Sequence, residues 1–246
     1  MSITMVMPIS VETIPLARLT LAFAPVVAVV VILWKWKLDY KTALHAMVRM
    51  LVQLLLIGYL LVFLFEEENA LVILCALSVM LLASSWIALR NLTIPLRIAL
   101  PKALLAIGLG GSLVLWIVTQ GVLNLDPWFA PAKMIPLAGM IFATAMNSVS
   151  LAGERVQAEL SRDVRFEDAR AVALKAALIP ITNSLFAVGL VSLPGMMTGQ
   201  ILSGVSPFIA ARYQIMVMCM IFGAAGISAA LFLVATRADF RVGESE

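Results

Sequence analysis

Charged residues are concentrated in one stretch of this otherwise apolar chain, between Glu154 and Lys175. Five acidic and five basic side chains lie there, with apolar residues between them. Val156, Leu160 and Val164 recur every four residues, so they share one face of a helix. The charges suit ion pairs with another protein, and the apolar face suits packing against it. We therefore expect this stretch, about residues 154–175, to be a docking segment for a soluble partner that supplies energy.

The pattern within the docking segment predicts two short amphipathic helices separated by a charged turn. The turn runs from Arg162 to Arg165, and the second helix begins near Phe166. Glu167 and Asp168 favour a helix start there because acidic side chains stabilise the positive end of a helix dipole. An amphipathic helix lying on the inner leaflet is the alternative. The residues assigned to coupling with the partner are Val156, Leu160, Arg162, Asp163, Val164 and Phe166.

Residues for catalysis by the chain itself are scarce. The sequence has no Gly-Lys pair, so it has no P-loop. His45 is the single histidine, which excludes paired-histidine metal motifs. A membrane hydrolase would also need a nucleophile with a base and an orienting group, and no such set is evident. We expect no enzyme activity and no directly bound cofactor, with ATP and Mg used by the partner.

The composition is that of an integral membrane protein. Of 246 residues, 63% are hydrophobic and 13% charged, and the mean hydropathy is +1.06. A soluble domain carries about a quarter charged residues. Cys75 and Cys219 lie far apart in apolar segments and indicate neither a disulfide nor a metal pair.

Continuous apolar runs of about 20 residues predict membrane-spanning helices. We expect an all-α, polytopic membrane helix bundle that forms a single permease domain over residues 1–246. Its seven predicted spans are Leu16–Trp34, Ala43–Phe65, Ala70–Leu89, Leu104–Gln120, Met134–Ala152, Ala177–Leu193 and Tyr213–Thr236.

The basic residues between the spans orient this bundle. Most of them fall on one side, in the loops that follow the first, third, fifth and seventh spans. The opposite side holds the acidic cluster at 66–68. The positive-inside rule then places the N-terminus outside, and the C-terminus and the docking segment in the cytosol. The net charge of +3 follows from this bias, so no nucleic-acid partner is expected.

Polar and sulfur-containing side chains within the spans are candidates for a transport path. Arg49 and Gln53 are four residues apart and share a helix face, and Arg49 either snorkels to the headgroups or contacts the bundle interior. No Asp or Glu falls inside a predicted span, which disfavours a proton-driven transporter. The remaining candidates, which alternatively pack or hydrogen-bond between helices, are Met140, Met146, Asn147 and Asn183. The sequence assigns no metal ligands.

A helix break late in the sixth predicted span is the best candidate for a gate. Pro194-Gly195 ends or kinks the helix, and Gly195 and Gly199 are four residues apart. Irregular backbone at membrane depth is tolerated only where protein buries it or where it lines a cavity. The gate residues assigned are Pro194, Gly195, Met196, Met197 and Gly199.

Several segments resemble the FetB (YbbM-like) permease family, whose members are membrane subunits of ABC transporters assigned to iron export. The resemblance extends over nearly the whole chain from the second span onward, and its segment at 192–197 is quite specific. The matching stretches are Leu190–Gly199, Tyr213–Val217, Ile135–Ile141 and Ala176–Pro180, with Arg49, Gln53, Gly58 and Tyr59. The chain departs from the family pattern at Asn183 and Phe186, where charged residues are common.

The resemblance implies a homodimer of this subunit in the lipid of the bacterial cytoplasmic (inner) membrane, bound to two copies of a cytosolic ABC ATPase. It also implies that the docking segment is a coupling helix and that the cargo is iron or another metal ion. Two alternatives stay open: an ABC permease for a lipid or nucleotide-sugar type cargo, and an ATPase-independent secondary transporter or membrane scaffold.

Overall fold

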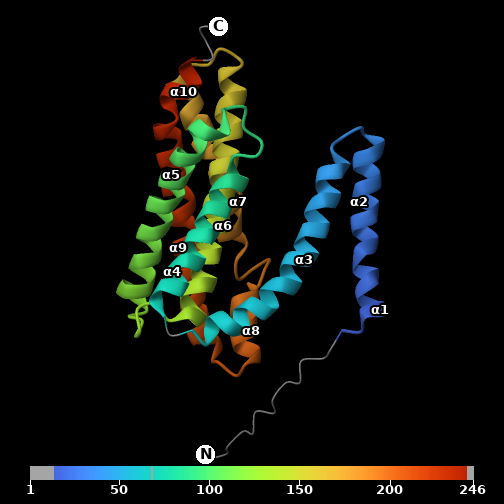
Figure 1. Cartoon of the computed structure of the whole chain (residues 1–246), viewed down its shortest axis with the longest axis vertical. Coiled ribbons are helices and arrows are strands. Elements are labelled where there is room, and N and C mark those ends of the chain that lie inside the picture. The colour runs from blue at the N-terminus through green and yellow to red at the C-terminus, as the bar shows by residue number, and fades with distance from the viewer. Residues whose placement is uncertain (1–13, 68, 243–246) are drawn as a thin grey trace, which may run out of the picture. The chain divides into compact units, whose positions relative to one another are not determined.

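The computed structural model describes residues 14–67 and 69–242, which form two compact units, Met1–Glu66 and Glu67–Glu246. Glu68 of the acidic cluster lies outside the described residues. Residues 1–13 also lie outside them, and with them the N-terminus that is predicted to be external. Helices make up nearly all of the described structure, as predicted (Figure 1). The molecule is a polytopic bundle of membrane helices.

The amino-terminal unit is a helical hairpin. It contains α1 (Leu16–Leu19), the 3-10 turn η1 (Thr20–Phe23), α2 (Ala24–Lys35) and α3 (Tyr40–Phe65). The α3 helix begins at Tyr40 because the side chain of Asp39 accepts a hydrogen bond from the backbone N–H of Thr42, at 3.1 Å. Both long helices expose many apolar side chains, as expected for helices surrounded by lipid or by other helices.

The carboxy-terminal unit is a tighter bundle. Its helices are α4 (Ala70–Ala88), α5 (Leu96–Trp116) with a π-helical continuation η2 (Ile117–Val122), α6 (Pro131–Leu160), α7 (Phe166–Ala187), α8 (Gly195–Leu202), α9 (Pro207–Ala235) and α10 (Arg237–Val242). Prolines occupy the first helical position of α6 and α9, where their missing N–H costs nothing.

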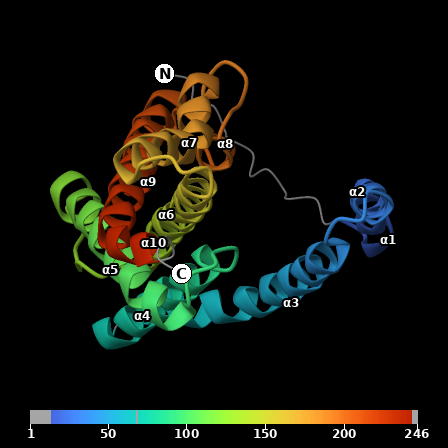
Figure 2. The same cartoon turned by 90° about the horizontal axis from the view of Figure 1, so that it is seen from above.

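The α9 helix packs against α5, α6, α7 and α8, and Figure 2 shows it beside α5, α6 and α7. Its contact face is built from small residues, including Ala224, Ala225 and Ala229, all of which are fully buried. Small side chains let packed membrane helices approach closely.

Six helical segments among the described residues are long and apolar enough to cross a membrane, and they coincide with six of the seven predicted spans. The remaining predicted span, Ala177–Leu193, is not a continuous helix. It belongs to α7, which begins eleven residues earlier in the charged stretch and ends at Ala187. The next helix, α8, starts only at Gly195.

Candidate functional site

The charged stretch is the junction between two long helices. The α6 helix continues unbroken to Leu160, a turn covers 161–165, and α7 begins at Phe166. The prediction of two separate short amphipathic helices was therefore wrong. The boundary at the turn was right, but each flank is the end of a helix that continues into the apolar bundle. The hydropathy pattern did not predict these continuous helices, because a helix can pass from charged to apolar sequence without any change of backbone conformation.

The apolar face predicted for docking packs within the chain itself. Val156 and Phe166 are buried in a cluster with small residues of α6, α7 and α9, and Leu160 and Val164 are half-buried against the same cluster. Arg162 and Asp163 are exposed at the tip of the turn. Asp163 has a φ of 60°, a left-handed conformation that tightens the turn. The side chains available to a partner are therefore the charged residues at the tip.

Ion pairs hold the flanks of this turn in place. Arg155 pairs with Glu159 along α6, at 2.5 Å. Glu167 pairs with Arg170 at 2.6 Å and with Arg237 at 2.7 Å, which joins α7 to α10. Arg162 makes no ion pair within the described part of the chain, so its charge is free for a partner.

The break between α7 and α8 is the second feature of the site. The carbonyl of Ala187 accepts hydrogen bonds from the N–H groups of Leu190, Val191 and Ser192 at 2.8–3.2 Å, so the chain turns sharply after α7. Gly189 takes a φ of 83°, which a side chain would disfavour. Figure 1 shows this yellow-to-orange segment leaving α7 and returning to helix in α8.

The lengths of α7 and α8 indicate how much of a membrane each helix could cover. Only about the last 12 residues of α7 are apolar, and they span about 18 Å at 1.5 Å per residue. The 8 residues of α8 add about 12 Å, so both helices are needed to cover the roughly 30 Å hydrocarbon core. Both pack against α9. Together α7 and α8 have the length of one membrane crossing, interrupted between Ala187 and Gly195.

A cavity of about 340 Å³ opens at this break. It lies between the end of α7, the start of α8, and the middle of α6 and α9. Four of the predicted path and gate residues line it, namely Met140, Pro194, Gly195 and Met196. The other lining residues are Ser184, Val188, Ser192, Gln214, Val217, Met218 and Ile221.

Gln214 is the functional candidate that the sequence analysis missed. It lies on α9, is only 6% exposed, and lines the cavity. Its Oε1 atom has no hydrogen-bond partner among the described residues, and leaving a buried acceptor unpaired costs about 1–3 kcal/mol. The signal was available, because Gln214 lies within the predicted span Tyr213–Thr236 and within the stretch Tyr213–Val217 that carried the family resemblance.

A second cavity, of about 330 Å³, lies on the other side of Met196. It is lined by Gln200 of α8, Tyr213 and Met216 of α9, and Lys133 at the start of α6, among others. The Oε1 atom of Gln200 also lacks a partner within the described chain. Met196 lines both cavities, and its predicted role as a gate stays a prediction.

The remaining predicted residues lie elsewhere. Met146, Asn147, Asn183, Met197 and Gly199 line neither cavity, and Asn147 and Asn183 are exposed on the helix surface. No group of three or more His, Cys, Asp or Glu residues that could hold a metal ion occurs in the described ranges.

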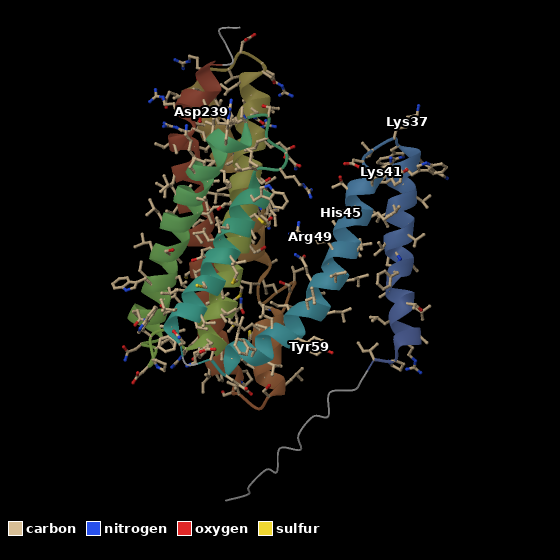
Figure 3. All side chains as sticks on the ribbon, in the orientation of Figure 1. Lys37, Lys41, His45, Arg49, Tyr59 and Asp239 are labelled. Carbon is tan, nitrogen blue, oxygen red and sulfur yellow. The ribbon has the colours of Figure 1, made fainter. Side chains whose placement is uncertain are left out.

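Arg49 and Gln53 belong to the amino-terminal unit. Lys41, His45 and Arg49 follow one another at four-residue intervals along α3 (Figure 3), and Gln53 continues the series. Arg49 is half-buried and Gln53 exposed. The α3 helix thus carries a polar, mainly basic side, which is costly to expose to lipid.

Comparison with known proteins gives a consistent set of relatives. Residues 16–240 match the model of the uncharacterised protein family UPF0014. The chain is 34% identical to the probable iron export permease protein FetB of Escherichia coli, over 85% of this chain and 86% of that protein. It is 33% identical to a UPF0014 membrane protein of Synechocystis, over 70% and 73% of the two chains. It is also 32% identical to the protein ALUMINUM SENSITIVE 3 of Arabidopsis thaliana, over 83% and 81%. No solved structure matches.

Proposed function

Because the chain belongs to the UPF0014 family of membrane proteins, we propose that it is the membrane-spanning permease subunit of an ABC exporter. ATP and Mg are used by a separate cytosolic ATPase, and the subunit works as a homodimer in the bacterial cytoplasmic membrane. The docking segment lies on the cytosolic side, where the ATPase contacts the exposed charges at the tip of its turn.

The observation that carries this proposal is the path of α7. This helix begins at the exposed turn beside Phe166 and ends at Ala187, where the cavity opens. Phe166 and the first turns of α7 are fixed to α6 and α9 by the buried cluster. A helix with one end at the partner and the other at the cavity transmits a push on the turn to the break, and Pro180 in its interior is a point where it can bend.

The proposed cargo is iron or another metal ion, following the printed name of the Escherichia coli relative. The thioethers of Met140, Met196 and Met218 at the cavity can contact soft metal ions. A second candidate, a polar organic cargo of the lipid or nucleotide-sugar type, is favoured by the uncharged lining of the same cavity.

Co-purification tests the docking part of the proposal. The chain is co-expressed with a cytosolic ATPase encoded beside it, and the bound ATPase is measured for the wild type and Arg162→Glu. We expect charge reversal at the tip to reduce binding at least fivefold without changing the amount of protein in the membrane. The matched control is Arg90→Glu, an exposed arginine outside the turn. Equal losses in both variants would contradict docking at the turn.

Uptake into inverted membrane vesicles then tests the energy source and the identity of the cargo separately. ATP-dependent accumulation of ferrous iron supports the exporter and its cargo. If the complex forms and hydrolyses ATP but moves no iron, the ABC assignment stands and the iron cargo is excluded. Iron movement that continues without any ATPase would show a secondary transporter instead.

A further inference from the structure

The second cavity, of about 330 Å³, combines mainly apolar walls with one cationic side chain. Eight of its eleven lining residues are apolar, and they come mainly from α6, α8 and α9. The other three are Lys133, Gln200 and Tyr213. A pocket with apolar walls and a few polar groups is typical of a site for a small organic molecule.

Lys133 and Tyr213 carry polar groups that the chain itself leaves without a partner. Neither side chain makes a hydrogen bond or an ion pair with any residue that the structure describes. Asp126, the acidic residue nearest to Lys133 in the sequence, is exposed and does not pair with it. Within the described ranges, no acidic residue lines the cavity. Because Lys133 is exposed, its ammonium group is available to an anion that enters from outside the protein.

The single lysine sets the charge of a ligand that fits this cavity. One ammonium group neutralises a monoanion such as a carboxylate. A dianion would keep one uncompensated charge beside apolar walls, and a metal cation would meet a like charge there, and both are unfavourable. The eight apolar lining residues require the remainder of the ligand to be apolar.

The cavity lies at the end of α6 opposite the docking segment. Lys133 is the third residue of α6, whose 30 residues extend about 45 Å at 1.5 Å per residue. This length exceeds the roughly 30 Å hydrocarbon core of a membrane. If the docking segment is cytosolic, as predicted, Lys133 therefore lies at the outer surface. Leu137, which also lines the cavity, is one turn further along α6 and so lies deeper in the membrane.

We propose that the second cavity binds an apolar monocarboxylate from the outer side of the membrane. The carboxylate pairs with the ammonium group of Lys133 and accepts a hydrogen bond from the hydroxyl group of Tyr213, while the apolar body packs against the walls. The acid reaches the site either from water or from the outer lipid leaflet, and its chemistry is the same in both cases. This site goes beyond the proposed function, because binding there needs neither the ATPase nor iron.

Equilibrium binding to the purified full-length chain in phosphatidylcholine nanodiscs tests this site. The probes are radiolabelled decanoate, which partitions into lipid, radiolabelled phenylacetate, which stays in water, and the uncharged analogue decanol, with empty nanodiscs as the background. We expect Lys133→Met to weaken binding of the better acid by about tenfold or more, since a charge-assisted contact is lost, and to leave decanol binding unchanged. Tyr213→Phe is expected to weaken acid binding by about threefold or more.

The matched control is Arg212→Met. Arg212 is an exposed cation next to Tyr213 in the sequence, but it does not line the cavity. Its replacement removes the same charge near the start of α9, and this variant is expected to bind the acid like the wild type. Lys133→Arg keeps the charge and is expected to retain binding. Thermal unfolding of all four variants checks that the bundle is intact.

Three outcomes would overturn the proposal. They are the absence of saturable binding of both acids above the empty nanodiscs, wild-type affinity for the better acid in Lys133→Met, and an equal loss in Arg212→Met and Lys133→Met, which would show only general attraction to a basic surface. Tighter binding of decanoate would identify the lipid leaflet as the source of the acid, and tighter binding of phenylacetate would identify water. Failure of ATPase docking or of iron transport would leave this site standing, and failure of acid binding would leave the exporter proposal standing.

Discussion

Gly110 determines how closely α5 approaches α9. A Cβ atom at this position would lie 2.6 Å from the Oγ of Ser228 and 3.1 Å from its backbone nitrogen. The adjacent Gly111 makes a similar approach to α6, where a Cβ atom would lie 3.0 Å from Ile141 and Phe142. Membrane helices associate through such close contacts because lipid supplies no hydrophobic force between them.

Gly110→Ala is therefore expected to destabilise the bundle by about 1–3 kcal/mol, since the methyl group forces α5 and α9 apart. Thermal unfolding in a mild detergent measures the effect. Gly121→Ala, in the continuation of the same helix, is the control because nothing lies within 4 Å of its added Cβ atom. Equal melting temperatures for the two variants would show that the α5–α9 contact is not tightly packed.

At the scale of elements, α10 ties the charged end of the bundle together. Asp239 pairs with Lys102 of α5, and Arg237 pairs with Glu167 of α7 at 2.7 Å. The Arg237 guanidinium also lies 5.8 Å from the centre of the Phe166 ring. The short helix α10 thus joins α5 to the start of α7, beside the turn proposed to bind the ATPase.

Asp239→Asn is expected to lower the free energy of unfolding by about 1–3 kcal/mol, because it removes the charge from a pair whose side chains are only 18% and 26% exposed. The control is Asp168→Asn. Asp168 pairs with Arg165 at 2.8 Å, but these side chains are 56% and 84% exposed, so about 1 kcal/mol or less is at stake. Chemical denaturation compares the two. A larger loss in Asp168→Asn would contradict the anchoring role of α10.

At the scale of the whole molecule, the topology depends on whether α7 and α8 cross the membrane together. If α7 and α8 cross the membrane together, the turn at 161–165 and the loop at 203–206 lie on opposite sides. If α8 instead folded back, both would lie on one side. The neighbours of α8 on α9 favour crossing. Met196, near the start of α8, lines the first cavity together with Val217. Gln200, further along α8, lines the second cavity together with Ile209, which lies nearer the start of α9.

Single cysteines at Ser161 and Ser203 test this topology in a background without Cys75 and Cys219. Both serines are exposed. In intact cells, a membrane-impermeant thiol reagent is expected to label Ser203→Cys at once, and Ser161→Cys only after the cells are broken. This result would also establish the predicted orientation, with the docking segment in the cytosol. Simultaneous labelling at both positions would contradict a complete crossing.

Much of the architecture follows directly from local sequence. Apolar runs of spanning length, helix caps such as Asp39, and prolines at helix starts act within a few residues, so six spans and the helical class were predictable. The motifs around Pro194 and Tyr213 indicated the family, which the comparisons confirm. The helix break predicted at Pro194-Gly195 is present, and Pro194, Gly195 and Met196 line a cavity there.

The sequence by itself therefore determined the membrane location, the helices and the concentration of charge at one junction. Only the tertiary structure decided that Val156 and Phe166 pack inside the chain, that α7 stops at Ala187, and that Gln214 is buried beside a cavity. These features depend on contacts between helices that are distant in sequence. Hydropathy reports how well a segment tolerates lipid, but it does not report which neighbour covers a side chain or leaves it unpaired.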